Sequence, residues 1–108
     1  MKKGEIYLIN LVGSGNQQIG LRPVVVYSKV VGNLVIIVPM TSNLDALRYN
    51  ATCKVKKSLV NNLGVDSVAL IFQLRAINVS NFGRKIGKLN KEDLDFINRE
   101  LREFLDLK

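Results

Sequence analysis

A chain of 108 residues fits one domain and leaves no room for two independent cores, so the sequence predicts a single domain over residues 1–108. The apolar fraction of 47% excludes a wholly disordered chain. The net charge of +7 favours a polyanionic partner such as nucleic acid, although the same charge also suits a protein that only needs to stay soluble.

The positive charge lies in the body of the chain. Residues 1–90 contain twelve Lys and Arg against three Asp and Glu, a net charge of +9. Residues 91–108 contain four against six, a net charge of −2. We therefore expect a basic surface on the body and a mildly acidic C-terminal segment.

Apolar runs separated by turn residues predict three strands in the first part of the chain, at residues 6–11, 22–27 and 34–40. A loop rich in Gly and Gln joins the first two, and its ten residues are long enough to suggest a functional loop. Pro23 cannot donate a backbone hydrogen bond, which predicts a place at the start of its strand or on a sheet edge. Gly32 and Asn33 predict a tight turn before the third strand.

The middle of the chain predicts two further strands, at residues 51–56 and 67–78, with a short helix or turn at 58–63 between them. In the long fifth strand, Gln73 and Arg75 share one face because side chains alternate along a strand. A turn at 81–83 and a short strand at 85–89 follow.

The last segment predicts a helix that begins after Asn90, a good N-cap residue with Asp93 three positions later. An apolar stripe at helical spacing assigns this helix to packing: Leu94, Ile97, Leu101, Phe104 and Leu105. Successive strands followed by one helix predict a mostly β protein, an antiparallel barrel or curled sheet capped by the C-terminal helix.

The absence of His disfavours zinc sites, Ser-His-Asp triads and two-histidine ribonuclease sites. The body has only three scattered carboxylates, at Glu5, Asp45 and Asp66, so we expect no metal site and no cofactor. The single cysteine, Cys53, excludes an internal disulfide and is predicted to be an apolar filler.

Two features bear on localisation. The lysines near the N-terminus precede no long apolar run, so we expect no signal peptide. No stretch approaches the roughly 20 apolar residues of a membrane span. We therefore expect a cytoplasmic protein.

The remaining polar side chains suit contacts with phosphates and bases: Gln17, Gln18, Arg22, Thr41, Ser42, Asn43, Gln73 and Arg75. Arg presents a planar fork of donors to a phosphate. RNA carries its own nucleophile, the 2′-hydroxyl, so an enzyme that cleaves it needs to position the chain and stabilise charge on the phosphoryl oxygens. These residues permit a ribonuclease without selecting one.

Four segments together resemble the MazF/PemK (Kid-like) toxin family of mRNA interferases: GEIYL at 4–8, QQIGLRPVVV at 17–26, VPMTS at 38–42 and DSVALIFQLRAI at 66–77. The Gly-x-Arg-Pro-Val string at 20–24 is fairly specific, and the Gln-x-Arg string at 73–75 adds weight. The C-terminal helix also resembles that of the family, so the resemblance spans nearly the whole chain.

The resemblance implies an SH3-like antiparallel barrel that forms a homodimer. It also implies the toxin of a type II toxin–antitoxin system, a sequence-specific and metal-independent endoribonuclease of single-stranded mRNA. Cleavage would proceed by 2′-hydroxyl attack and leave a 2′,3′-cyclic phosphate. The implied protein partner is an antitoxin with an acidic, disordered tail.

Residue by residue, the resemblance assigns catalysis to Arg22 and Thr41. Arg22 would stabilise the pentacoordinate phosphorane and Thr41 would hold the phosphate by its hydroxyl. The loop at 15–20 would line the RNA path, and the implied RNA-binding residues are Gln17, Gln18, Gly20, Ser42, Gln73 and Arg75. The chain departs from the family at Gln17, where several relatives carry a carboxylate, and at Ile19-Gly20, where they carry Gly-Gly. These departures leave the general base unassigned.

Alternatives remain open at this stage. Arg22 could pair with a carboxylate beside its strand, Thr41 could only cap a turn, and Gln73 and Arg75 could be solvated residues of the sheet face. The same barrel also serves a toxin that poisons DNA gyrase without catalysis, and a degenerate relative could bind RNA or an antitoxin without cutting.

Overall fold

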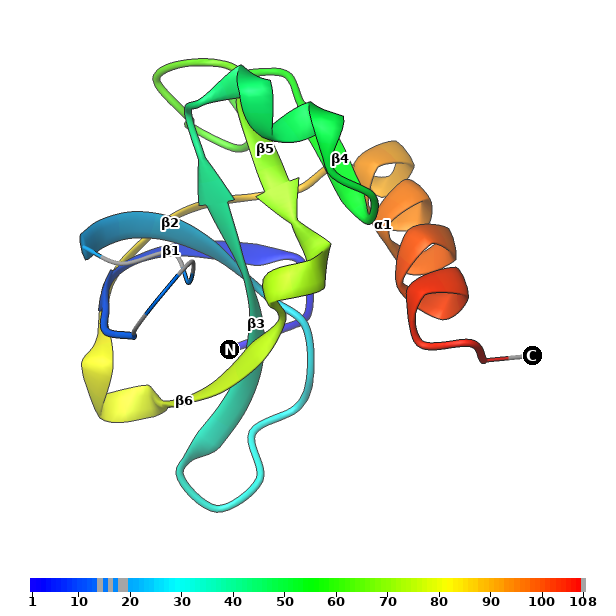
Figure 1. Ribbon diagram of the computed structural model, residues 1–108. Helices are drawn as coiled ribbons and strands as arrows, with labels where there is room; N and C mark the ends of the chain where they lie inside the picture. The colour runs from blue at the N-terminus through cyan, green and yellow to red at the C-terminus, as the bar shows by residue number, and fades with distance from the viewer. Residues whose placement is uncertain (14, 16, 18–19, 108) are drawn as a thin grey trace.

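The computed structural model describes residues 1–13, 15, 17 and 20–107. Seven strands form one strongly curved antiparallel sheet in the order β4-β5-β3-β2-β1-β7, with β6 paired to β3 (Figure 1). The strands are β1 Glu5–Leu11, β2 Gly20–Val26, β3 Leu34–Thr41, β4 Thr52–Val55, β5 Ser67–Leu70, β6 Arg75–Asn78 and β7 Phe82–Lys88. The helix α1 spans Lys91–Phe104. The predicted mostly β fold with a C-terminal helix is therefore confirmed.

The ring of strands seen in Figure 1 is open between β6 and β7. No ladder joins these two strands among the described residues; the short 3-10 helix η3, Val79–Asn81, connects them. The ring is therefore a partly open, SH3-like barrel.

Two apolar clusters lie on opposite faces of the sheet, because successive residues of β3 point to alternate sides. The first cluster lies beneath α1 and includes Ile6, Val25, Val38, Met40, Ile71 and Ile97. The second cluster consists of Ile9, Leu11, Val24, Val26, Val35 and Ile37. The prediction that the third strand is buried on both faces is confirmed for most of its length.

The predicted long strand at 67–78 is wrong: it is interrupted by a 3-10 helix, η2, at Ile71–Gln73. Four residues of β3, from Met40 to Ile37, oppose seven residues of the partner segment, from Ala69 to Arg75. The three extra residues bulge out of the ladder and place Leu70 and Ile71, which are adjacent in sequence, both in the interior. Gln73 lies in η2 and Arg75 begins β6, so the two side chains do not follow the alternation of one continuous strand that predicted a shared face.

The prediction for Pro23 is also wrong, because β2 lies between β1 and β3 and is a central strand. Pro23 pairs with Leu8 on β1. The pairing of β2 with β3, however, ends one residue later, at Val24 opposite Pro39. The β2–β3 ladder therefore does not extend to Pro23. A proline is tolerated at this position because no hydrogen bond to β3 requires the backbone donor that it lacks.

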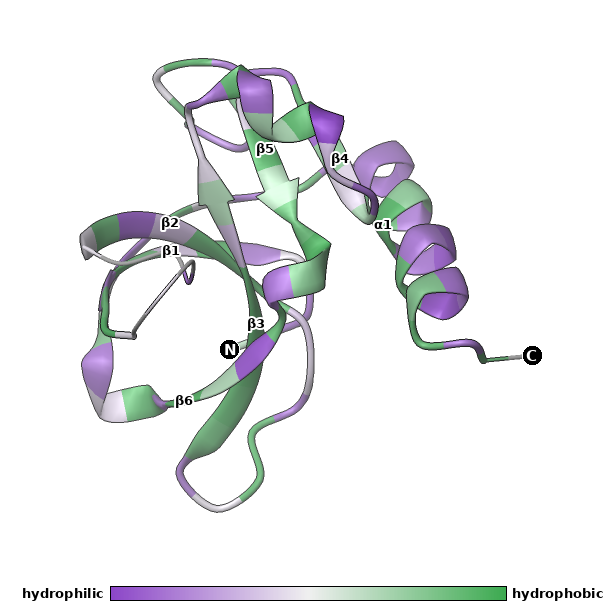
Figure 2. Cartoon of the chain, viewed as in Figure 1, coloured by the Kyte–Doolittle hydropathy of each residue, from purple (hydrophilic) through white to green (hydrophobic). Residues whose placement is uncertain are grey.

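The helix α1 begins as predicted, with the Asn90 side chain accepting a hydrogen bond from the Asp93 backbone N at 2.8 Å. Ile97 is fully buried against the first cluster, whereas Phe104 and Leu105, which the stripe assigned to packing, are about half exposed. Figure 2 shows hydrophobic and hydrophilic residues alternating along this helix. Among the described residues, no helix is long and apolar enough to cross a membrane.

Gly87 in β7 packs against the backbone of the 58–63 turn. A Cβ at this position would lie 2.5 Å from the Val60 carbonyl oxygen and 2.6 Å from the Asn61 carbonyl carbon. Neither backbone group can move cheaply, because the Asn61 side chain is buried and accepts backbone hydrogen bonds from Ser58 and Leu63.

We expect Gly87→Ala to lower the free energy of unfolding by about 3 kcal/mol, at the upper end of typical overpacking costs. Urea unfolding followed by circular dichroism measures the change. Gly64→Ala is the matched control, because a Cβ there meets nothing within 4 Å. Equal stability of the two variants would contradict the close packing of β7 on this turn.

The carboxylate of Glu5, on β1, contacts both the neighbouring strand β7 and the segment that precedes β1. Lys85 Nζ lies 2.7 Å from Glu5 Oε2, and the Lys2 backbone N donates to Glu5 Oε1 at 2.7 Å. The hydrogen bond from Lys85, followed by that from Lys2, lowers the pKa of Glu5 from 4.5 to about 2.

A lowered folded-state pKa means that ionised Glu5 stabilises the fold above its unfolded pKa of 4.5 and that this stabilisation is lost as pH falls toward 2. We expect Glu5→Gln to be less stable than the parent chain at pH 7 and to show a weaker loss of stability between pH 4.5 and 2. Urea titrations at several pH values measure both slopes. Parallel slopes would rule out Glu5 as the titrating group.

Candidate active site

Arg22 and Thr41 come from neighbouring strands and from the same face of the sheet. The β2–β3 register pairs Val26 with Ile37 and Val24 with Pro39, so its continuation by two residues places Arg22 opposite Thr41. Arg22 also pairs with Ile9 of β1, which belongs to the second cluster. Both side chains therefore lie on the face of the second cluster, where the β2–β3 ladder has ended.

The Arg22 guanidinium is half-buried and incompletely paired. Its Nη1 donates to the Leu21 carbonyl oxygen at 3.1 Å, while its Nε is buried without a hydrogen-bond partner among the described atoms. The ion pairs within the described residues, Glu5–Lys85 and Lys91–Asp95, do not include it. The alternative in which a carboxylate holds Arg22 thus finds no partner in the described chain. A buried donor on a cation is costly unless a ligand satisfies it.

Thr41 ends β3 and lies where that strand changes partners. It pairs with Val68 of β5, on the edge of β3 that faces away from β2. Its Oγ1 accepts a hydrogen bond from the Asn43 backbone N at 3.2 Å, so Thr41 does form the turn that sequence reasoning allowed. The hydroxyl hydrogen is not used in that bond, which leaves it able to donate to a ligand.

Arg75 lies on the same face as this pair. It pairs with Ile37, a second-cluster residue, and its Nη1 donates to the Val12 carbonyl oxygen at 2.7 Å, at the start of the β1–β2 loop. Burial lowers the pKa of Arg75, but an arginine stays charged at neutral pH. A Cβ on Gly13 would lie 3.0 Å from Arg75 Nη1 and 2.6 Å from Gln17 Oε1. Gly13 therefore allows Gln17 and Arg75 to pack beside the loop.

The other predicted RNA-binding residues fall in different places. Gly20 begins β2 with φ +89°, a left-handed conformation that favours glycine. Ser42 is exposed directly after Thr41. Gln73 ends η2 and lines one pocket together with Thr41. Gln18 lies outside the described residues.

A pocket of about 340 Å³ adjoins Thr41. It lies between the β3–β4 connection and η2, and its walls are Thr41, Asn43, Asp45, Ala46, Arg48, Tyr49, Leu70, Phe72 and Gln73. We call it the Thr41 pocket. The predicted residues Thr41 and Gln73 thus meet here. Sequence reasoning missed Asp45, Arg48 and Tyr49 as site residues. They lie on a short 3-10 helix, η1 at Leu44–Arg48, and just after it, in a segment for which the sequence predicted no element.

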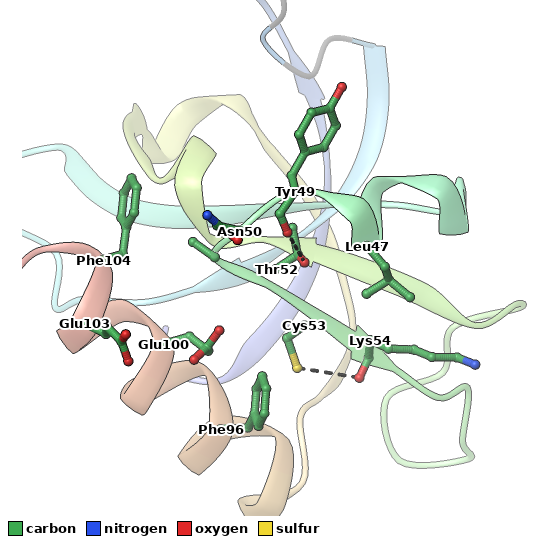
Figure 3. Close-up of a pocket in the computed structure, with 11 residues that line it drawn as sticks. Leu47, Tyr49, Asn50, Thr52, Cys53, Lys54, Phe96, Glu100, Glu103 and Phe104 are labelled. Carbon is green, nitrogen blue, oxygen red and sulfur yellow. Dashed lines mark hydrogen bonds between the residues drawn. The ribbon is translucent and has the colours of Figure 1, made fainter.

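A larger pocket of about 630 Å³ lies elsewhere, between β4 and α1 (Figure 3). None of the predicted site residues lines it. Cys53 does, and burial raises the pKa of its thiol to about 12, so at neutral pH it is a protonated, unreactive side chain. Size alone therefore does not locate the site. Within the described residues, no three His, Cys, Asp or Glu side chains gather into a group that could hold a metal ion.

Comparisons with known proteins agree on one family. The family model of the PemK-like, MazF-like toxin of type II toxin–antitoxin systems matches residues 2–105. A curated relative, Endoribonuclease MazF of Staphylococcus saprophyticus, is 27% identical over 106 residues, which cover 94% of this chain and 88% of that protein.

Solved structures of low sequence identity share the fold. MazF (Form-I) of Deinococcus radiodurans superposes with a TM-score of 0.83 at 22% identity, over 99% of this chain and 97% of that one. The Mycobacterium tuberculosis toxin MazF-mt6 superposes with a TM-score of 0.76 at 22% identity, over 96% and 98%. A MazE–MazF structure (Form-II) of D. radiodurans superposes with a TM-score of 0.77 at 20% identity, over 100% and 97%.

Proposed function

Because this chain belongs to the PemK-like, MazF-like toxins of type II toxin–antitoxin systems, we propose that it is an endoribonuclease that cuts single-stranded mRNA at specific sequences without a metal ion. The observation that carries the proposal is the half-buried Arg22, whose Nε has no hydrogen-bond partner among the described atoms and whose position in the continued β2–β3 register is opposite Thr41. A guanidinium and a hydroxyl on one face of the sheet suit one phosphodiester.

In the proposed reaction the 2′-hydroxyl oxygen attacks the adjacent phosphorus, and the bond from phosphorus to the 5′-oxygen of the next nucleotide breaks. Negative charge builds up on the non-bridging oxygens as the phosphorane forms. Arg22 would neutralise that charge. Its Nε is already desolvated, which makes the effect of this donor larger than in water. The 2′-hydroxyl proton passes to solvent water and the leaving 5′-oxygen takes up a proton from water, so the products are a 2′,3′-cyclic phosphate and a 5′-hydroxyl.

Thr41 would hold the phosphate by donating its hydroxyl hydrogen to a second non-bridging oxygen. Its hydroxyl is oriented by the hydrogen bond that it accepts from Asn43 N, and its backbone is fixed by pairing with Val68. A fixed donor keeps the phosphorus in line with the attacking oxygen, and such positioning is a large part of the catalysis of phosphate chemistry.

Arg75 and Gln17 would bind the RNA strand beyond the cut. Arg75 is held by Val12 at the start of the β1–β2 loop, so RNA contacts by the loop and by Arg75 are coupled. Gln17 carries no charge and cannot take the proton of the 2′-hydroxyl; its amide can donate to a phosphate. The proton of the attacking hydroxyl is therefore not assigned to a side chain.

We further propose the partners and location implied by the family. The basic body, with its net charge of +9 over residues 1–90, suits an antitoxin whose acidic, disordered tail competes with RNA. The active form is proposed to be a cytoplasmic homodimer. Sedimentation tests the homodimer, and mixing with the cognate antitoxin tests that partner. Neither measurement depends on RNA cleavage.

Incubation of the purified protein with a long single-stranded RNA in excess chelator tests the proposed activity. We expect cleavage at a small set of sites, with 2′,3′-cyclic phosphate ends. RNA that stays intact in the presence of protein shown by circular dichroism to be folded would overturn the nuclease assignment. Inhibition of gyrase supercoiling, assayed separately with Mg²⁺ and ATP and without chelator, would then point to a non-catalytic toxin.

A further inference from the structure

The Thr41 pocket is a consequence of the interruption between β5 and β6. The three extra residues of η2 carry Phe72 and Gln73 out of the ladder and against the β3–β4 connection. Its volume of about 340 Å³ is at the small end of ligand pockets, roughly 300–1,000 Å³, and suits one base-sized ring. Thr41 forms part of its wall, so the pocket opens beside the proposed phosphate site.

One wall of the pocket carries two aromatic rings that are inclined at 52° to each other. The rings of Tyr49 and Phe72 lie 5.6 Å apart, and the Arg48 guanidinium lies 5.0 Å from the centre of the Tyr49 ring. Arg48 Nη2 also donates to the Tyr49 hydroxyl at 3.0 Å, and Phe72 packs against the first cluster. Aromatic rings and guanidinium planes of this kind stack on the unpaired bases of single-stranded RNA.

The rim of the pocket carries polar groups of defined orientation. Asn43 Oδ1 accepts from the Asp45 backbone N at 3.1 Å, which leaves the Asn43 amide hydrogens for a ligand. The Asp45 carboxylate lines the pocket and takes part in none of the ion pairs of the described chain. A carboxylate repels RNA phosphates, so Asp45 does not suit the RNA backbone. It suits the edge of an RNA base that offers N–H donors.

We propose that the Thr41 pocket binds a guanine base of the RNA next to the scissile phosphate, with Asp45 accepting from the base and Tyr49 stacking on it. Guanine alone among the four RNA bases presents two adjacent N–H donors, N1–H and the 2-amino group, on its Watson–Crick edge. Two carboxylate oxygens match that pair. The backbone N of Asn43, which donates to Thr41 Oγ1, links the base pocket to the phosphate site. This assignment rests on the proposed ribonuclease function.

The first test is a map of the cut sites on a long transcript in chelator. We expect guanine at one fixed position within about two nucleotides of every cut. Cleavage at sites with no fixed guanine would overturn this inference and leave the ribonuclease function standing. The absence of any cleavage would overturn the function itself.

The second test uses two short RNAs built on one mapped site, with guanosine or inosine at the fixed position. Inosine lacks only the 2-amino group. We expect the parent chain to cut the guanosine RNA with a kcat/KM about tenfold higher, the discrimination typical of one bidentate contact. Asp45→Asn replaces one acceptor oxygen by a donor, and we expect it to cut both RNAs at equal rates.

Two variants serve as controls. Asp95→Asn makes the same change on α1, outside the pocket, and we expect it to keep the tenfold difference. Arg48→Ala weakens the stacking surface, so we expect a higher KM for both RNAs with the guanosine-to-inosine ratio preserved. If Asp45→Asn discriminates as the parent chain does, Asp45 does not read the base and the inference fails.

Discussion

Replacing Arg22 by Ala is expected to lower kcat for RNA cleavage by about 10²–10³-fold, the usual loss when one preorganised donor to a developing oxyanion is removed. The Nε of Arg22 is already desolvated and lacks a partner among the described atoms, so the guanidinium is held ready for an anion. Its removal leaves no buried partner uncompensated, because its described hydrogen bond is to the Leu21 carbonyl of the adjacent residue. We therefore expect Arg22→Ala to remain folded.

Single-turnover cleavage of a short RNA measures this loss, and thermal unfolding checks the fold. Arg84→Ala is the matched control, because Arg84 is an exposed arginine on β7 and does not line the Thr41 pocket. We expect it to leave kcat unchanged. An unfolded Arg22→Ala protein would assign Arg22 a structural role, and full activity of a folded one would remove it from the chemistry.

Replacing Thr41 by Val is expected to lower kcat by about 10²-fold with a small change in stability. Val keeps the branched shape and the pairing with Val68 but removes the hydroxyl that would hold the phosphate. It also removes the acceptor of the Asn43 backbone N, a loss of about 1 kcal/mol for a partly exposed hydrogen bond.

Thr41→Ser separates these two roles, since it restores both the hydroxyl and the acceptor. We expect it to recover most of the activity. A Thr41→Val protein that cuts as fast as the parent chain would limit Thr41 to capping its turn. The loss should appear in kcat more than in KM, because the phosphate contact strengthens as charge builds up.

The strands and the helix were predictable where one local signal decides the structure. Asn90 begins α1 because its side chain caps the helix, and Gly32 lies in the tight turn with φ +61°. The interruption at Ile71–Gln73 was not predictable, because Ile, Phe and Leu are good strand formers and nothing local marks a break. Its cause is tertiary: Leu70 and Ile71 both become buried in the interior.

The alignment of Arg22 with Thr41 in the continued register could not be derived from the hairpin turn. The turn pairs Val31 with Leu34, and a ladder continued from there would place Asn43 opposite Arg22. The observed register, Val26 with Ile37, is shifted by two residues. Ser28 absorbs part of this shift, since its hydroxyl accepts from the Ile36 backbone N at 2.9 Å. The family resemblance named both residues, but only the shifted register, continued by two residues, would bring them opposite each other.

The most direct test is a short RNA substrate with a single 2′-deoxynucleotide on the 5′ side of the scissile phosphate, compared with the all-ribose RNA in chelator. If the 2′-hydroxyl is the attacking group and Arg22 and Thr41 only hold and neutralise the phosphate, the deoxy RNA stays intact while the ribose RNA yields a 2′,3′-cyclic phosphate. Cleavage of the deoxy RNA at the same bond would mean that water or a side chain attacks, and would contradict this mechanism.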